Sequence, residues 1–247
     1  MDDFAKELEK QLKPLYLNLI EDVKNIQGPK YTFAVQWGKD YPLDKNRGIL
    51  FVGRATNTWY ESEEIPDIEK LFGSHDEKFT IFNRPDQMIW VNREWNTYSH
   101  KSAFWRVIRA VSRSFYSVDE TNPCNDLNHI AWSNVCKIQM DTGKNPDRMM
   151  FDRQISTCEK IFLVEINALS PKFVVMFIGD YGKREFLSYL NGGKMPSIIE
   201  SASWNSFLVN VYQIGSVFYL CTEHPQCKNE SSHINCLVNL IHKYSEV

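Results

Sequence analysis

Two side chains in this sequence could recognise a planar ligand and assist chemistry on it: the amide of Asn134 and the imidazole of His224. An amide presents both a donor and an acceptor, which can pair with the edge of a heterocycle. An imidazole can stabilise negative charge that develops on a departing group or a carbonyl oxygen. The pair suits recognition of a nucleobase better than acyl transfer, since the chain has no Gly-x-Ser-x-Gly turn.

Asn134 and His224 each follow an apolar segment of strand length, and two similar segments end at Gly53 and Gly179. Continuous apolar runs separated by helix-length stretches are typical of buried parallel strands joined by crossovers. The four runs span residues 49–52, 130–132, 173–178 and 217–222. In open parallel sheets the ligand site lies beyond the carboxyl ends of the strands. The pattern therefore predicts that Gly53, Asn134, Gly179 and His224 gather at one edge of the sheet.

Helical periodicity surrounds these strands, at residues 2–26, 99–115, 149–169, 180–191 and 231–244. Pro14 is expected to end or kink the first helix, and Gly192-Gly193 to end the fourth. Three arginines share one face of the second helix: Arg106, Arg109 and Arg113. They could contact phosphates or form a solvated face, and the solvated face is the preferred interpretation.

The remaining segments are less regular. Residues 28–48 are rich in turn-forming residues, and residues 207–211 predict an edge strand or a hairpin that leads into the fourth core strand. Residues 54–99 contain no clear core strand, yet their many aromatic side chains argue against disorder. We expect an ordered excursion beside the site, in which 80–83 and 88–91 could form a hairpin.

Composition excludes several classes of protein. A formal net charge of −3 excludes a globally basic nucleic-acid binder, although a local basic patch is compatible with it. No apolar stretch reaches the ~18–20 residues of a membrane span, and the N-terminus has no signal-peptide apolar region, so a cytoplasmic protein without a membrane partner is expected. The six cysteines form no CxxC pair, which predicts free thiols in a reducing compartment.

Neither a cofactor nor a metal is expected. The chain has no Gly-x-Gly-x-x-Gly turn and no Walker A loop for a dinucleotide or a nucleoside triphosphate. A zinc site is conceivable by spacing from Cys221, His224, Cys227 and His233. Alternation of side chains along a strand, and a proline in the middle, oppose the convergence of these four residues.

At the ends of the four strands the chain resembles the uracil-DNA glycosylase superfamily. Gly53-Arg-Ala-Thr-Asn57 stands where the family has a glycine-led first active-site loop, and Trp132-Ser-Asn-Val-Cys-Lys137 is similar to the segment that supplies a base-contacting Asn in several branches. The stretch from Cys158 to Gly179 resembles the family's long helix, Leu-x-Pro-Lys turn and glycine-ended strand. Glu223-His-Pro-Gln226 is similar to the His-Pro-Ser motif of the second active-site loop. The matches follow the family's order within residues 48–244.

The expected architecture is one uracil-DNA glycosylase-like domain over residues 1–247, with an N-terminal helical extension (about 1–45) and an insertion (about 60–98). Its fold would be a three-layer α/β/α sandwich around a central four-stranded parallel sheet in strand order 2-1-3-4. The resemblance implies excision of a damaged or deaminated base from DNA, with the base flipped out of the stack. Asn134 would read the base edge, His224 would stabilise charge on the departing base, and Gly53, Arg54 and Gly179 would contact the substrate.

The chain departs from the family's pattern in the first loop. Family members carry Asp, Glu or Asn just after the glycine, to position water or stabilise the sugar cation, whereas Arg54 and Ala55 stand here. Asn57 is the nearest substitute for positioning water. The iron–sulfur branches need four cysteines, of which only Cys158 aligns, and Gln226 replaces the serine after His-Pro. Two alternatives follow: a catalytically weak or inactive nucleobase or nucleic-acid binding module on the same fold, or a pocket for another small planar ligand.

Overall fold

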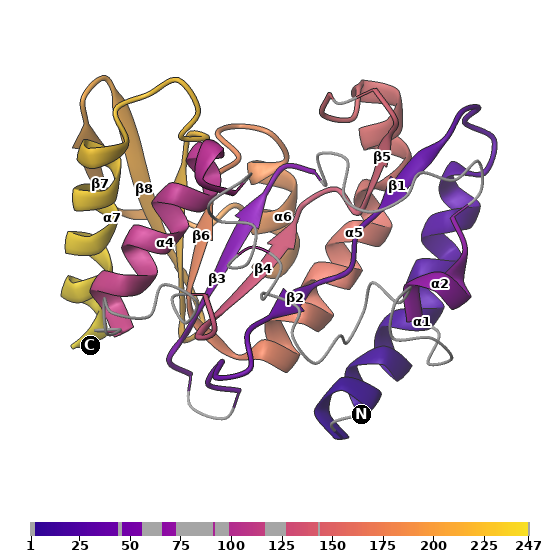
Figure 1. Ribbon diagram of the computed structural model, residues 1–247, viewed down its shortest axis with the longest axis horizontal. Coiled ribbons are helices and arrows are strands. Elements are labelled where there is room, and N and C mark those ends of the chain that lie inside the picture. Colours follow the sequence, from indigo (N-terminus) through magenta and orange to yellow (C-terminus); the bar gives the residue numbers. More distant parts are fainter. Residues whose placement is uncertain are drawn as a thin grey trace. The chain divides into compact units, whose positions relative to one another are not determined.

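The chain forms a mixed α/β structure built on one seven-stranded sheet (Figure 1). The computed structural model describes residues 3–43, 46–55, 66–72, 91, 99–116, 127–142 and 144–246. Contacts divide the chain into two compact units, each assembled from three segments. Unit 1 comprises residues 1–36, 53–85 and 133–169, and unit 2 comprises residues 37–52, 86–132 and 170–247.

The strands follow one another in the sheet in the order β2-β4-β3-β6-β9-β8-β7. Their bounds are β2 Gln36–Trp37, β4 Ile130–Asn134, β3 Gly48–Gly53, β6 Pro171–Met176, β9 Val217–Thr222, β8 Phe207–Ile214 and β7 Ile198–Trp204. The pairings of β3 with β6 and of β6 with β9 are parallel, whereas β9, β8 and β7 pair antiparallel. The four core strands expected from the sequence are thus neighbours in the expected order.

The expectation of a four-stranded, wholly parallel sheet is wrong, because the sheet has seven strands and is mixed. The expected hairpin that leads into the fourth core strand is confirmed as β8 and β9. β7 was missed because most of its residues are exposed or half-buried, so it has no continuous apolar run. A two-residue turn at Asn205-Ser206 joins it to β8, with Asn205 in the left-handed region at φ 52°.

In unit 2 two helices lie side by side, α4 (Ala103–Tyr116) and α7 (Glu230–Ser245) (Figure 1). Phe115 of α4 meets Phe173 of β6 edge to face, with 5.9 Å between the ring centroids. A short 3-10 helix, η1 (Ser99–Lys101), precedes α4, and α6 (Lys183–Leu190) follows β6. The expected end of α6 is confirmed, since Gly192 and Gly193 follow it with positive φ.

The arginines of α4 do not form the solvated face that was preferred. Arg109 is only 6% exposed. Arg106 makes a bidentate ion pair with Glu230 of α7, in which Nε and Nη2 lie 2.8 and 2.6 Å from the two carboxylate oxygens. Its Nη1 also donates to the His100 carbonyl oxygen at 2.5 Å. Arg106 therefore ties the start of α4 to η1 and to the first turn of α7.

In unit 1 the helices α1 (Asp3–Val23) and α5 (Arg148–Leu169) pack together. A short helix, α2 (Ile68–Phe72), lies against α1, where Phe72 meets Tyr16 edge to face at 5.2 Å. β1 (Lys30–Thr32) and β5 (Ile138–Met140) form a separate antiparallel pair. Apart from residues 66–72, which include α2, and Val91, the excursion expected at 60–98 and its hairpin lie outside the described residues.

The predicted end of the first helix at Pro14 is wrong, because α1 continues through it to Val23. Pro14 lies on the exposed side of the helix, where a carbonyl that loses its amide partner can bind water instead. The opposite side is buried at intervals of three and four residues. Its buried residues are Ala5, Leu8, Leu12, Tyr16, Leu19 and Val23. Among the described helices, none is long and apolar enough to cross a membrane.

Candidate functional site

In unit 2 the turn after β6 meets the segment after β9. The Gly179 amide donates to the Thr222 carbonyl oxygen at 2.9 Å, and Gly179 adopts φ +59°, in the left-handed region. A Cβ at this position would lie 2.7 and 2.9 Å from the two carboxylate oxygens of Glu223, closer than real Cβ atoms come. The close approach of that carboxylate therefore requires glycine here.

His224 is half-buried, and its contacts include a stacked aromatic ring and a hydrogen bond from the backbone. The imidazole stacks on Phe104 of α4, with 6.0 Å between centroids and 9° between planes. Nδ1 accepts a hydrogen bond from the Gln226 amide at 3.2 Å. Because an accepting Nδ1 carries no proton, the neutral ring holds its proton on Nε2. The chain thus sets the tautomer of this histidine.

The segment from Glu223 to Asn229 is held along its length. The Lys228 ammonium donates to the His224 carbonyl oxygen at 2.9 Å and lies 5.1 Å from the centroid of the Phe207 ring. The Asn229 side chain accepts from the Ser232 amide at 2.9 Å and so caps α7. Cys227 adopts φ +59°, a conformation that residues other than glycine seldom take.

A second histidine, His233 of α7, is fully buried against the end of β9. Its ring stacks on Trp204, with 3.8 Å between centroids and 2° between planes. Its Nε2 lies 3.1 Å from Thr222 Oγ1, which also accepts the Trp204 indole N–H at 3.1 Å. Burial, with a smaller electrostatic effect of the neighbouring Lys228 and His224, lowers the pKa of His233 to about 3. This imidazole is therefore neutral at physiological pH.

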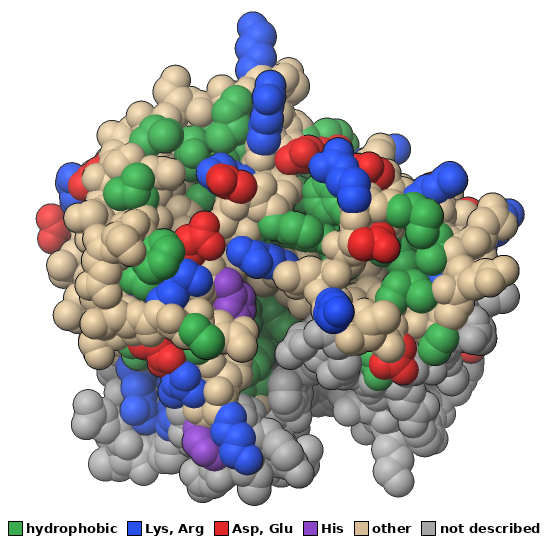
Figure 2. Space-filling model, turned by 90° about the horizontal axis from the view of Figure 1, so that it is seen from above, with side chains coloured by type: hydrophobic (Ala, Val, Ile, Leu, Met, Phe, Trp, Pro, Cys, Tyr) green, Lys and Arg blue, Asp and Glu red, His purple; other side chains and the backbone are tan. Residues whose placement is uncertain are grey.

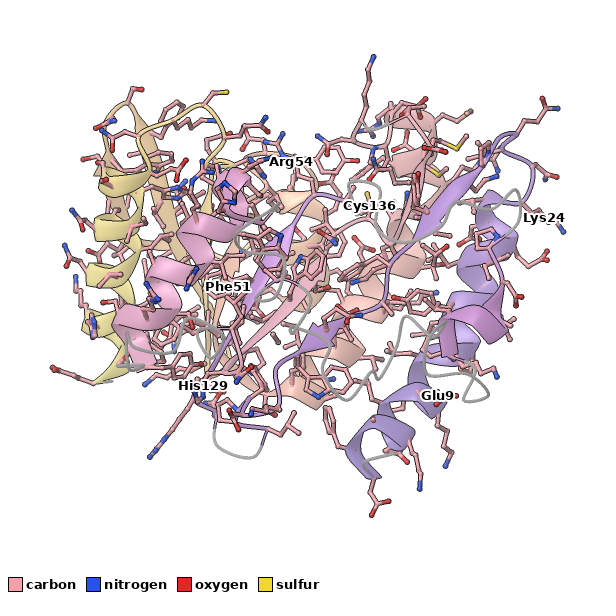
Figure 3. The ribbon with its side chains drawn as sticks, in the orientation of Figure 1. Glu9, Lys24, Phe51, Arg54, His129 and Cys136 are labelled. Atoms are coloured by element: carbon pink, nitrogen blue, oxygen red, sulfur yellow. The ribbon has the colours of Figure 1, made fainter. Side chains whose placement is uncertain are left out.

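In unit 1 the segments that leave β3 and β4 run together. The Val135 amide donates to the Gly53 carbonyl oxygen, and the Cys136 amide donates to the Arg54 carbonyl oxygen, both at 3.0 Å. Figure 3 labels Arg54 and Cys136 on these two segments. Asn134 directly precedes Val135 and is 1% exposed, whereas Arg54 is half-buried.

A buried polar cluster fixes this segment to α5. The Ser133 hydroxyl donates to a Glu165 carboxylate oxygen at 2.6 Å. The Lys137 ammonium donates to Ser133 Oγ at 2.6 Å and lies 2.8 Å from both oxygens of Glu165. The side chains of Lys137 and Glu165 are both 0% exposed. Burial raises the pKa of the Glu165 carboxyl group, and the neighbouring Lys137 and Ser133 oppose that rise.

The structure thus brings the predicted residues together in two groups. Gly53 and Asn134 lie on adjacent segments of unit 1, and Gly179 lies beside the segment that carries His224 in unit 2. Asn57 lies outside the described residues. No role was predicted for the Glu223 carboxylate, which stood only within the motif around His224, although an acidic residue directly after a core strand is a visible signal in the sequence.

The zinc alternative finds no support. Among the residues that the structure describes, no group of three or more His, Cys, Asp and Glu side chains could hold a metal ion. Cys221 lies with its sulfur 3.8 Å from that of Met176, and His233 is engaged with Thr222. None of the five described cysteines forms a disulfide.

Figure 2 shows acidic and basic side chains interspersed over the described part of one face, with hydrophobic side chains between them. No model of a known protein family matches the sequence, and no curated protein matches it. The resemblance to uracil-DNA glycosylases therefore rests on the motif residues named above.

Proposed function

We propose that this protein binds a nucleobase of a nucleic acid and hydrolyses its N-glycosidic bond, on a three-layer fold like that of the uracil-DNA glycosylases. The observation that carries the proposal is the hydrogen bond from the Gln226 amide to Nδ1 of His224. It leaves the proton of the neutral imidazole on Nε2, where the ring can donate to a carbonyl oxygen of a base. Donation to an oxygen that gains charge as the base departs stabilises the transition state more than the ground state.

The other predicted residues have complementary roles in this proposal. Phe104 holds the plane of the His224 ring, so that the donor does not have to be oriented during the reaction. Asn134 reads the base edge from a segment that Lys137 and Glu165 fix in place. Gly53 and Gly179 allow the backbone to approach the substrate, while Arg54 contacts it and Asn57 positions water. The order of β4, β3, β6 and β9 supports the family-like sheet.

A binding module on the same fold is the second candidate function, and Arg54-Ala55 favours it. A cation near the anomeric carbon opposes the positive charge that develops there. The loss of one such catalytic interaction commonly costs on the order of 10²–10³ in rate. A module of this kind would bind the base and release it unchanged.

Labelled oligonucleotides that carry uracil, hypoxanthine or xanthine test the proposal, with alkaline cleavage to reveal abasic sites. We expect cleavage at one of these bases, loss of most of it in His224→Gln, and weakened binding in Asn134→Ala. The exposed His242→Gln is the matched control and should behave as the wild type. Replacing Arg54 or Ala55 by an acidic residue should raise the rate.

Each other outcome has a clear meaning. Binding of the oligonucleotide without abasic product would establish the module instead. Absence of both binding and product for all three bases would overturn the proposed function. Cleavage that is unaffected in His224→Gln would remove the role given to that imidazole.

A further inference from the structure

A carboxylate stands beside His224 at the end of β9, and the roles above make no use of it. Glu223 is half-buried, and the close approach of its two oxygens to Gly179 is possible only because that residue has no Cβ. β6 and β9 are adjacent parallel strands, so Gly179 and Glu223 both lie just past their carboxyl ends. Ligand sites in open α/β sheets lie at this edge.

We propose that Glu223 is the catalytic carboxylate of the N-glycosidic hydrolysis, in the role that Arg54 and Ala55 cannot perform. The inference rests on the proposed function and names the group that activates water for it. Glu223 and His224 are consecutive, so one short segment carries both the general base for water and the hydrogen-bond donor for the departing nucleobase. A carboxylate near the anomeric carbon also stabilises the cationic sugar electrostatically.

The structure positions this carboxylate from both sides. Before it, Thr222 is fixed through its carbonyl oxygen by Gly179 and through its hydroxyl by Trp204 and His233. After it, Lys228 and the cap of α7 hold the segment that contains His224. Both the carboxylate and the imidazole therefore sit on backbone that is anchored before substrate binds, which reduces the reorganisation that the reaction requires.

The step balances without any reactant other than water. The bond between the anomeric carbon and the base nitrogen breaks, and its electron pair goes to the base, whose oxygen accepts a hydrogen bond from His224 Nε2. The water oxygen forms a new bond to the anomeric carbon and passes one proton to the Glu223 carboxylate. That proton then goes to the departed base or to solvent, which gives a neutral base, an abasic sugar and an ionised Glu223.

Glu223→Gln tests the assignment, because it keeps the shape of the side chain and removes its charge. With the oligonucleotide that the wild type cleaves, we expect single-turnover cleavage to fall about 10²–10³-fold. The Kd for that oligonucleotide should change less than about threefold, and Glu223→Asp should recover part of the rate.

The exposed Asp180, which is paired with Lys183, offers a nearby control. Asp180→Asn should cleave at the wild-type rate. Wild-type cleavage that persists in Glu223→Gln would overturn the role of Glu223 and leave the proposed function standing. Binding of the wild type without any cleavage would overturn the catalytic role as well, whereas absence of both binding and cleavage would remove the proposed function itself.

Discussion

At the scale of single residues, two histidines at one end of β9 have opposite environments. His224 lies half-buried on a loop with its tautomer set by a backbone amide, while His233 is fully buried, stacked on Trp204 and perpendicular to Phe177. His233 has no hydrogen-bond partner for Nδ1 among the described residues, so protonation would place an uncompensated charge in the core. The same residue type thus serves structure at one position and, in our proposal, chemistry at the other.

The first prediction concerns the pH dependence of stability. The pKa of His233 falls from 6.5 to about 3 on folding, so the unfolded chain binds a proton more readily than the native state. The neutral His233 ring therefore makes its full contribution to the free energy of unfolding above pH 6.5, and this contribution is lost as the pH falls towards 3. At pH 5 the loss should be about 2 kcal/mol. Denaturant unfolding at pH 7.5 and 5 measures this difference.

In His233→Gln the difference between the two pH values should shrink by about that amount, whatever the absolute stability of the variant. The exposed His242→Gln should retain the full difference. An equal loss between pH 7.5 and 5 in the wild type and in His233→Gln would show that other groups govern the acid sensitivity.

At the scale of elements, the segment that carries Asn134 is anchored to α5 by an ion pair that water does not reach. Lys137 and Glu165 compensate each other, and the Ser133 hydroxyl bonds to both. Removing one member leaves a buried charge without its partner, which typically costs 3–5 kcal/mol, whereas apolar replacement of both members is often close to neutral.

The second prediction follows from that asymmetry. Lys137→Met should lower the free energy of unfolding by about 3–5 kcal/mol, and the double variant Lys137→Met, Glu165→Met should recover about 2 kcal/mol or more of the loss. Chemical denaturation of the wild type, Lys137→Met, Glu165→Met and the double variant gives the four free energies of a double-mutant cycle. Lys160→Met, on the exposed side of α5, is the control and should change stability little. A double variant that is less stable than Lys137→Met would contradict this account.

The same elements show what the sequence could and could not predict. The four core strands were predictable because strands covered on both faces read as continuous apolar runs, as in Phe173 to Met176. The sequence could not predict that the sheet has seven strands, because β2 has only two residues and β7 is exposed along most of its length. Pro14 was misleading because its exposed position lets the buried side of α1 continue unbroken.

For the site, the sequence placed Gly179 and His224 at strand ends, which requires only the strand pattern. It could not show that Glu223 meets Gly179, because that contact depends on the left-handed turn at Gly179. Nor could it predict the pairing of Lys137 with Glu165. A lysine and a glutamate 28 positions apart carry no spacing signal, and only the packing of α5 reveals them as partners.

At the scale of the whole molecule, the charges argue for recognition of a base more than of a phosphate backbone. The formal net charge is −3. Several cations already have partners within their own unit: Arg106 with Glu230, Lys183 with Asp180, and Lys243 with Glu200. The face in Figure 2 mixes both signs over its described part. Each of these side chains would have to break its ion pair with a carboxylate before it could contact a phosphate of the nucleic acid.

The last prediction is therefore a weak dependence of nucleic-acid binding on salt. Each phosphate contact contributes about −0.7 to −0.9 to the slope of log affinity against log salt concentration. With about two contacts, affinity for a uracil-containing oligonucleotide should fall less than about 20-fold between 50 and 200 mM salt, whereas 6–10 contacts would cost about 10³–10⁵-fold. Fluorescence anisotropy at both salt concentrations measures this change in affinity, and the same oligonucleotide with an abasic site in place of uracil is the control.

If the base supplies most of the binding energy, the abasic strand binds much more weakly at both salt concentrations. A thousandfold loss of affinity with salt, shared by both strands, would instead show that contacts to the phosphate backbone supply most of the binding energy.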